Sequence, residues 1–475
     1  MRTKINRDSQ ITISTQLFEI LKRDILQNNW KENSRFYSIR QVSIKYDVNP
    51  NTVLKVFQTL EEQGYLFSIQ GKGSYIKKGY NLDVSERMAP ILNTFKLGQD
   101  NKKGEINLSN GAPPSEFFPT EAYRKILGAI LSDKEESKIL LGYQNIQGLE
   151  SLRKVIPNYL KKFKINVSKD DIIIGTCTQS ILSLICTTFN QMPKKTMLLS
   201  KPTYQNAVRI FENYYNIENI NLLPDGWDME EFELLLKRKK IDFIYVMTNF
   251  QNPTGITWSE KKKRKLLELS LKYDFYIIED ECFCDFYYDG NIPTSLKSID
   301  TKERVFYLKT FSKSVMPGIS LALFIPPKSF LEKFSLNKYF VDTTTSGINQ
   351  KFLEIYIKNG MMEEHLEKLR EIFSKKMEYV INKLYNIPHL RITHIPKGGF
   401  FLWIELANYI DGEKFYYKCR LRGLSILPGF LFDSTGRTSC NIRISIVSAN
   451  LDEIDAGFDI IADILKHCNG IPKSV

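Results

Sequence analysis

Residues 305–322 read V-F-Y-L-K-T-F-S-K-S-V-M-P-G-I-S-L-A, and this stretch decides how the rest of the chain is interpreted. The apolar run V-F-Y-L predicts a short buried strand. It is followed by the hydroxyl groups of Thr310 and Ser312, then Lys313, then a Pro-Gly turn. A lysine held at a strand end can form a Schiff base with an aldehyde cofactor if its pKa is lowered. Alternatively, Lys313 is an ordinary solvated lysine on the surface, as most of the 66 lysines and arginines must be. The residues upstream of Lys313 distinguish these two interpretations.

Apolar runs that predict strands alternate with helical stretches from Ile106 onward. They are Ile172–Ile174, Met197–Leu199, Phe243–Met247, Phe275–Ile278 and Val305–Leu308. Strands separated by helices predict a largely parallel sheet with helices on both faces, and such sheets bind ligands at the carboxyl ends of their strands.

Polar residues that suit a phosphorylated cofactor follow these runs. The segment G-T-C-T-Q, residues 175–179, opens a predicted helix, whose free N–H groups suit a phosphate. The segment N-F-Q-N-P-T-G places Asn252 in a tight turn, and Asp280 follows the next strand. Phosphate turn, Asn-Pro-x-Gly, Asp and Lys therefore occur in this order, which chance rarely produces.

This order resembles that of the fold-type I pyridoxal phosphate enzymes, the class I and II aminotransferases, over residues 107–475. The resemblance implies a large mixed, mostly parallel sheet with helices on both faces, and a smaller C-terminal α+β domain. It implies that pyridoxal 5′-phosphate forms a Schiff base with Lys313 and that Asp280 pairs with the ring nitrogen.

The same resemblance assigns further roles. Asn252 would bond the ring hydroxyl oxygen, Tyr204 in K-P-T-Y would stack on the ring, and Arg443 in N-I-R-I-S would hold the carboxylate of the substrate or effector. The phosphate would be held by Cys177, Thr178, Gln179, Thr310, Ser312 and, from the partner subunit, Tyr143.

Three residues depart from the family pattern. Ser320 stands where the family has an arginine that neutralises the cofactor phosphate. The family has a tyrosine two or three residues after Asp280, but here the chain reads E-C-F and ends this segment with Phe283. Cys177 replaces a glycine of the phosphate turn. A charged hydrogen bond contributes about 1.5–3 kcal/mol, so we expect weaker cofactor binding unless Lys309 or another cation compensates.

Residues 1–79 are strongly basic, with 13 lysines and arginines against 7 acidic residues. Apolar spacing predicts a helix from Ile13 to Ile25, a second from about Ser38, its N-cap, through Tyr46, and a third that opens at Asn51 and buries Val53, Phe57 and Leu60. Two short apolar runs around Gly71-Lys72-Gly73 predict a β-hairpin with a basic tip. This pattern is typical of a winged helix-turn-helix that binds double-stranded DNA.

Here the chain resembles the DNA-binding domain of GntR-type regulators. The segment F-Y-S-I-R matches that family's L-P-S-x-R and N-P-N-T-V its recognition helix, although Pro50 stands where many relatives have arginine. The predicted DNA-binding residues are Ser38, Arg40, Asn51, Thr52, Gly71, Lys72 and Gly73.

Residues 80–106 are polar and irregular, which predicts a linker between the two domains. A GntR-type head joined to an aminotransferase-like body resembles the MocR/GabR regulators. That resemblance implies a homodimeric, head-to-tail transcription factor that binds an operator and senses a small amino compound, or pyridoxal phosphate itself. Two alternatives stay open: an active aminotransferase that carries a DNA-binding domain, and a regulator that has lost the cofactor.

Composition narrows the class further. A length of 475 residues predicts at least two domains, and neither a signal peptide nor a membrane-spanning run is present, so we expect a cytoplasmic protein. The seven cysteines and four histidines lack the spacing of a disulfide framework or a metal site, so we predict no metal.

Overall fold

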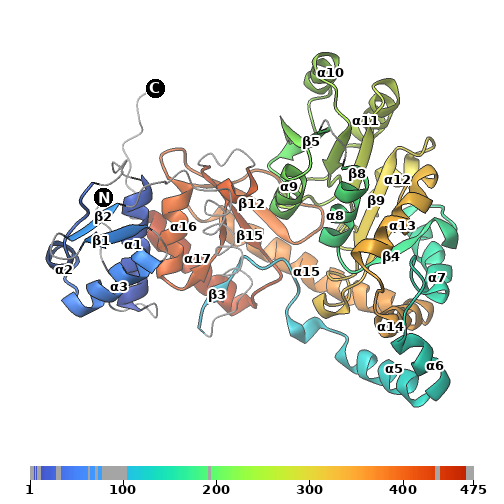
Figure 1. The fold of residues 1–475 in the computed structure, drawn as a ribbon, viewed down its shortest axis with the longest axis horizontal. Coiled ribbons are helices and arrows are strands. Elements are labelled where there is room, and N and C mark those ends of the chain that lie inside the picture. The colour runs from blue at the N-terminus through green and yellow to red at the C-terminus, as the bar shows by residue number, and fades with distance from the viewer. Residues whose placement is uncertain are drawn as a thin grey trace.

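The computed structural model describes residues 5, 7, 12–27, 34–62, 65–69, 73–76, 104–190, 194–433 and 439–466. Within these ranges a small helical unit with a hairpin comes first in the chain, and a large α/β unit follows it (Figure 1).

The first unit is a winged helix-turn-helix. It contains α1 (Ile13–Gln27), α2 (Ile39–Tyr46), α3 (Pro50–Glu62) and an antiparallel hairpin of β1 (Leu66–Ile69) and β2 (Gly73–Ile76). The predicted apolar residues of α3 lie in its core together with residues of α1 and α2. The predicted N-cap is confirmed, because Ser38 Oγ accepts a hydrogen bond from the backbone N–H of Gln41. Helix α3 begins one residue before the predicted start because Pro50 takes the first helical position, where a missing N–H costs nothing.

A seven-stranded mixed sheet forms the centre of the large unit, as predicted. Its order is β4-β10-β9-β8-β7-β5-β6, and all neighbours are parallel except those of β10. The strands are β4 (Ile173–Gly175), β5 (Thr196–Lys201), β6 (Asn216–Asn221), β7 (Phe243–Val246), β8 (Tyr276–Asp280), β9 (Val305–Thr310) and β10 (Ala322–Ile325).

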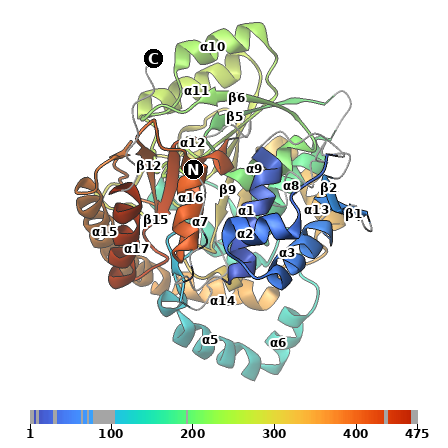
Figure 2. The same ribbon diagram turned by 90° about the vertical axis from the view of Figure 1, so that its left-hand side faces the viewer.

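Side chains that alternate along these strands divide the core between the two faces of the sheet. Met197, Leu199 and Tyr245 lie in the larger apolar cluster, whereas Leu198 and Ile244 lie in a second one, as a period of two requires. Helices α8 (Thr178–Thr188), α9 (Gln205–Glu212) and α13 (Leu331–Val341) cover the first face. The second is covered by α10 (Met229–Arg238), α11 (Glu260–Lys272) and α12 (Leu296–Ile299) (Figures 1 and 2).

A smaller antiparallel sheet is built mainly from the C-terminal part of the chain. Its order is β11 (Leu390–Ile392), β12 (Phe401–Leu406), β15 (Asn441–Ser445), β14 (Leu427–Pro428). Strand β3 (Ile106–Asn107) pairs in parallel with β13 (Leu424–Ser425), so the start of the large unit is tied to its end. The helices of this region are α15 (Met361–Tyr385), α16 (Gly412–Leu421) and α17 (Leu451–Lys466) (Figure 2).

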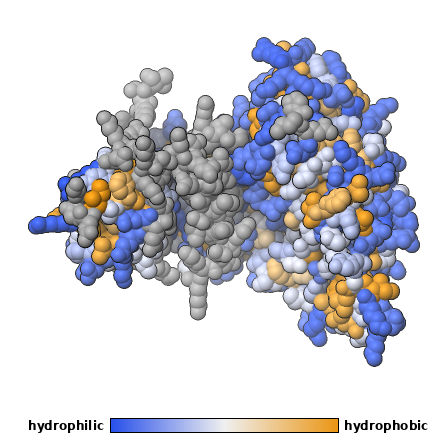
Figure 3. All heavy atoms as spheres, in the orientation of Figure 1, coloured by the Kyte–Doolittle hydropathy of each residue, from blue (hydrophilic) through white to orange (hydrophobic). Residues whose placement is uncertain are grey.

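Four more helices belong to the large unit: α5 (Thr120–Ser132), α6 (Lys134–Leu141), α7 (Glu150–Leu160) and α14 (Gly347–Lys358). Helices α5 and α6 project at one edge, where Figure 3 shows apolar side chains at the surface. Leu131, Ile139, Leu141 and Tyr143 are all more than half exposed there. Among the described helices, none is both long and apolar enough to cross a lipid bilayer.

Candidate functional site

A cavity of about 130 Å³ lies where the carboxyl ends of the central strands meet the smaller sheet. Its wall contains polar and charged side chains that follow β5, β7, β8 and β9, together with residues of β12 and β15. Seven residues predicted from the sequence line it: Thr178, Tyr204, Asn252, Asp280, Thr310, Lys313 and Arg443. Residues far apart in the sequence therefore meet at one point because parallel strands end at the same edge of a sheet.

Lys313 lies in the turn after β9 and is half-buried. Burial lowers the pKa of its amine, and the nearby Arg443 lowers it further, while Cys282 and Asp280 act in the opposite direction. A lowered pKa increases the neutral fraction, which is the nucleophilic form of a lysine.

Asp280 is the last residue of β8 and is buried. The hydroxyl of Tyr245 on β7 donates to its Oδ2 at 2.9 Å, whereas Oδ1 has no hydrogen-bond partner among the described residues. Burial raises the pKa of this carboxyl group to about 6, although the Tyr245 hydroxyl and the backbone N–H and thiol of Cys282 favour the charged form. Tyr245 thus fixes one oxygen, and the other is buried and can accept a proton donor.

Arg443 lies on β15 and is buried between aromatic rings. Its Cζ is 4.0 Å from the centroid of Phe401 and 5.1 Å from that of Phe432. Nη1 donates to Asn252 Oδ1 at 2.9 Å and Nη2 to the backbone carbonyl of Ser109, while the buried Nε lacks a partner among the described residues. Burial lowers the pKa of the guanidinium to about 9. The fork is held in one orientation at the cavity wall, as a carboxylate site requires.

Tyr204 lies just before α9, and its hydroxyl oxygen accepts two amide hydrogen bonds. Gln179 Nε2 donates at 3.3 Å and Asn206 Nδ2 at 3.1 Å. Gln179, predicted as a phosphate contact, is therefore engaged with the phenol and does not line the cavity.

The predicted phosphate turn lies at the start of α8. Cys177 Sγ accepts from the N–H of Ser180 at 3.4 Å and so caps the helix. Thr310 Oγ1 donates to Ser312 Oγ at 3.1 Å. Thr178 and Thr310 reach the cavity wall, whereas Cys177 and Ser312 do not.

Comparison with known proteins places this arrangement in a family. A family model described as aminotransferase class I and II matches residues 103–458, and one described as bacterial regulatory proteins, gntR family, matches residues 13–76. The chain belongs to the class I and II aminotransferase family. Its GntR segment gives it the MocR-type architecture of an HTH-type transcriptional regulator with an aminotransferase-like domain.

Individual relatives match either the whole chain or its body. The HTH-type transcriptional regulator YdfD of Bacillus subtilis is 26% identical over 474 residues, which cover 95% of this chain and 96% of that protein. Aromatic-amino-acid aminotransferase 1 of Thermococcus litoralis is 29% identical over 371 residues, 76% of this chain and 88% of that enzyme. The kynurenine aminotransferase structure of Pyrococcus horikoshii has a TM-score of 0.76 and 28% identity, covering 84% of this chain and 98% of that one.

The aminotransferase domain has residues that fit pyridoxal phosphate, the cofactor that this family normally binds. The free buried oxygen of Asp280 would accept a hydrogen bond from a protonated ring nitrogen, and burial already favours a nucleophilic Lys313. Thr178 and Thr310 offer hydroxyl groups and the N-terminus of α8 offers N–H groups to a phosphate.

The phosphate end of this site lacks the family arginine. Ser320 follows the 3₁₀ turn Pro317–Ile319, and its Oγ donates to the carbonyl of Thr176 at 3.3 Å, so the replaced position does adjoin the phosphate turn. Lys309 does not compensate, contrary to one possibility raised above. Its Nζ bonds Asp285 Oδ2 at 2.6 Å in a fully buried pair, because alternation along β9 directs it away from Thr310.

Tyr143 follows α6 and is 85% exposed, outside the cavity of its own chain. Its predicted contact with the phosphate of a partner subunit stays a prediction.

Several residues of the site were not identified from the sequence. Ser109, Asn110, Asn206 and Cys282 line the cavity, and Tyr245 contacts Asp280 from outside it. Asn206 and Asn110 each come a few residues after a strand, and a polar residue at such a position could have been recognised from the sequence as a candidate for the site. Tyr245 carries no such signal, because its role depends on a bond to the neighbouring strand.

The predicted DNA-binding residues lie on the winged helix-turn-helix. Arg40 is exposed on α2, Asn51 and Thr52 open α3, and Ser38 uses its hydroxyl to cap α2. Gly73 begins β2 with a φ of 104°, whereas Gly71 and Lys72 lie outside the described residues.

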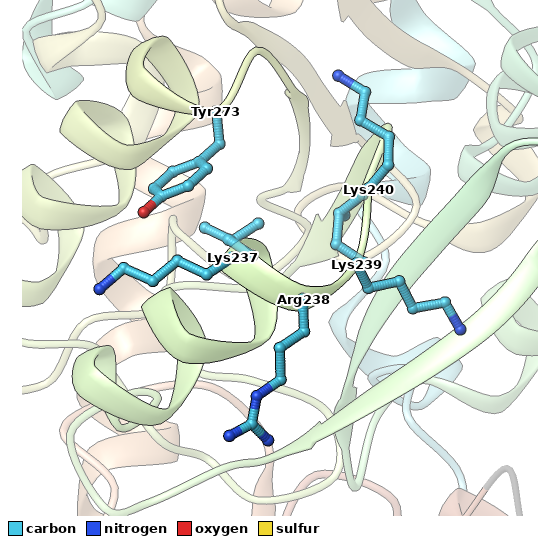
Figure 4. A pocket seen from close by; sticks show the side chains of 7 residues that line it. Lys237, Arg238, Lys239, Lys240 and Tyr273 are labelled. Carbon is cyan, nitrogen blue, oxygen red and sulfur yellow. The ribbon is translucent and has the colours of Figure 1, made fainter.

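A second hollow beside α10 is strongly basic. It is lined by residues 236–241 and Tyr273, and Figure 4 shows its lysine and arginine side chains pointing away from one another. Lys239 pairs with Glu218, and Lys240 donates to the carbonyl of Asp274 at 3.1 Å. Because the cations diverge, this hollow does not form a convergent anion site.

Proposed function

We propose that this regulator senses a small amino compound, or pyridoxal phosphate itself, through Lys313, and that the occupied site changes how its dimer binds an operator. The observation that carries the proposal is the meeting of Lys313, Asp280, Asn252 and Arg443 at one cavity in a chain that also has a winged helix-turn-helix.

Each residue has a distinct part in sensing. Pyridoxal phosphate, when bound, supplies an aldehyde that exchanges amines and a ring that withdraws electrons. Lys313 would hold the cofactor until an effector amine takes its place, and Asp280 would accept a hydrogen bond from the protonated ring nitrogen. The Arg443 fork, held by its bonds to Asn252 and Ser109, orients an effector carboxylate.

The signal requires two arrangements of the molecule. An effector changes the operator affinity only by as much as it binds one arrangement better than the other. We propose that the protein acts as a homodimer with two heads and a head-to-tail arrangement, so that a change in the bodies alters the spacing of the heads on DNA.

The first test is a titration of the full-length protein with pyridoxal phosphate, followed by visible absorption. We expect a band for the wild type and none for Lys313→Ala, while Lys328→Ala, which changes an exposed lysine, keeps it. Candidate amines should then shift the wild-type band and alter operator binding, and Lys313→Ala should bind the operator without responding. An unchanged amine response in Lys313→Ala would contradict the proposal, and no band in any protein would favour a regulator without cofactor.

A second candidate function is amino-group transfer. The intact set of Lys313, Asp280, Asn252 and Arg443 and the similarity to aminotransferases favour it. Multiple turnovers of an amino acid with a 2-oxo acid, well above the rate of free cofactor, would establish this activity. The absent family tyrosine and arginine predict that turnover is weak.

A further inference from the structure

The exposed face of α3 carries four side chains with a shared direction. Asn51, Leu54, Lys55 and Gln58 are spaced i, i+3, i+4, i+7 and are exposed, whereas Val53, Val56, Phe57 and Leu60 on the opposite face are buried. None of the four exposed side chains has a hydrogen bond or an ion pair with another residue that the structure describes. Leu54 is 43% exposed and is the apolar member of this stripe.

We propose that this stripe reads an adenine- and thymine-rich operator half-site in the major groove. The inference rests on the proposed operator binding and adds the class of base that is read. Carboxamides such as those of Asn51 and Gln58 bond the N6 and N7 of adenine in pairs, and an apolar side chain such as Leu54 packs on the methyl group of thymine.

The residue types on α3 also argue against a guanine-rich site. Paired hydrogen bonds from arginine or lysine to guanine are the commonest specific contact, and α3, P-N-T-V-L-K-V-F-Q-T-L-E-E, contains no arginine and one lysine. Lys55 is its one cation, and a flexible ammonium serves a phosphate as well as a base. The stripe thus has two side chains that suit adenine, Asn51 and Gln58, one that suits the thymine methyl group, Leu54, and a single cation, Lys55.

Local structure fixes where the stripe begins. Asn49 Oδ1 accepts from the N–H of Asn51 at 2.9 Å, and the Asn49 carbonyl accepts from the N–H of Thr52 at 2.9 Å. The α-helix rises by about 10 Å over the seven steps from Asn51 to Gln58, which is the length of roughly three base-pair steps. The four side chains can therefore address one continuous half-site.

DNA is favoured over a protein surface as the occupant of this face. Three of the four side chains are amides or a cation, and residues 1–79 carry 13 basic against 7 acidic residues, as a polyanionic partner requires.

The test begins with selection of binding sites from random duplex DNA by the full-length protein. We expect adenine and thymine at three or more adjacent positions of each half-site. Replacing those thymines by uracil, which removes the methyl group, should weaken the wild type roughly 5-fold or more, and 7-deazaadenine, which removes N7, should do the same. Leu54→Ala should bind thymine and uracil sites equally, and Gln58→Ala should lose part of its sensitivity to 7-deazaadenine.

Lys55→Ala is the matched control on the same stripe. It should weaken binding to all sequences alike, reduce the salt dependence, and keep the preference for thymine over uracil. A selected half-site rich in guanine and cytosine, or a Leu54→Ala protein that still distinguishes thymine from uracil, would overturn the inference while leaving operator binding intact. Failure to select any DNA would instead overturn operator binding, and this inference with it.

Discussion

At the scale of single residues, burial of Asp280 in the binding site lowers the free energy of unfolding of the cofactor-free protein. Its folded pKa of about 6 lies above the ordinary value of 3.8 because burial disfavours the charged form. The cofactor-free protein therefore loses stability as the pH rises from about 4 to about 6, since the unfolded chain ionises first and more easily. Above pH 6 this loss is complete.

Asp280→Asn should therefore stabilise the cofactor-free protein at pH 7.5 by about 1–3 kcal/mol, because one pKa unit corresponds to about 1.4 kcal/mol. The gain should vanish below about pH 3, where the carboxyl group of Asp280 is protonated in the folded and in the unfolded protein. Urea unfolding followed by the fluorescence of the buried Trp227 and Trp258 measures it. A gain that is independent of pH would show that the carboxyl group is not titrating in the folded state. The same variant should bind pyridoxal phosphate more weakly.

Ser320 offers a gain of function. Ser320→Arg restores a cation beside the phosphate turn, and a charged hydrogen bond of about 1.5–3 kcal/mol should tighten binding of pyridoxal phosphate roughly 10- to 100-fold. Ser320→Gln is the control, because it adds length without charge at the same left-handed backbone position. Equal affinities of the two variants in an absorbance titration would mean that charge is not what this position lacks.

At the scale of elements, Ser38 at the N-terminus of α2 has a structural role as a helix cap and a predicted role in DNA binding, and two substitutions distinguish them. Ser38 Oγ caps the helix, and Gln41 Oε1 accepts from the Ser38 N–H at 2.8 Å, so the two form a capping box. Ser38→Ala should destabilise the winged helix-turn-helix by about 1 kcal/mol, read as faster hydrogen exchange of the α2 amides. Ser38→Asp should keep the cap but weaken operator binding, because it adds a negative charge close to the phosphates. Normal operator binding by Ser38→Asp would remove Ser38 from the interface.

The elements also show how far sequence patterns reach. Five strands of the central sheet were predicted because they are apolar runs, and their polar carboxyl ends located the cavity. Strand β6, N-I-E-N-I-N, was missed because it lies at the sheet edge, where one face meets solvent and the run is half polar. Strand β10 was missed because it follows the Pro-Gly turn directly and runs antiparallel, outside the strand-helix alternation.

Contacts between elements escaped prediction for a different reason. The bond from Tyr245 to Asp280 joins residues 35 apart in sequence, and the pairing of Lys309 with Asp285 depends on which face of β9 each side chain occupies. Neither leaves a local pattern, since each is decided by the register of neighbouring strands. The sequence therefore located the groups that meet the cavity, but it did not reveal which side chains hold them there.

At the scale of the whole molecule, the position of Tyr143 bears on how two chains would share a site. Tyr143 is exposed just after α6, and the apolar Leu131 of α5 and Ile139 and Leu141 of α6 are exposed as well, which marks this region as a surface that a second copy could cover. In the proposed homodimer, we expect its hydroxyl to bond the cofactor phosphate at the site of the other chain, as the family resemblance implies. Each site would then be built from two subunits, with Lys313 from one and Tyr143 from its partner.

Mixed dimers test this arrangement. Tyr143→Phe alone should bind pyridoxal phosphate roughly 10- to 100-fold more weakly, through loss of a hydrogen bond to a charged group, and Lys313→Ala alone should show no absorption band. A heterodimer of the two variants, purified through two different tags, combines intact Lys313 with intact Tyr143 in one of its two sites. It should therefore show one site of wild-type affinity per dimer in an absorbance titration. If the one site of the heterodimer that shows the band bound as weakly as Tyr143→Phe, Tyr143 would act within its own chain, and the two sites of the dimer would be independent of each other.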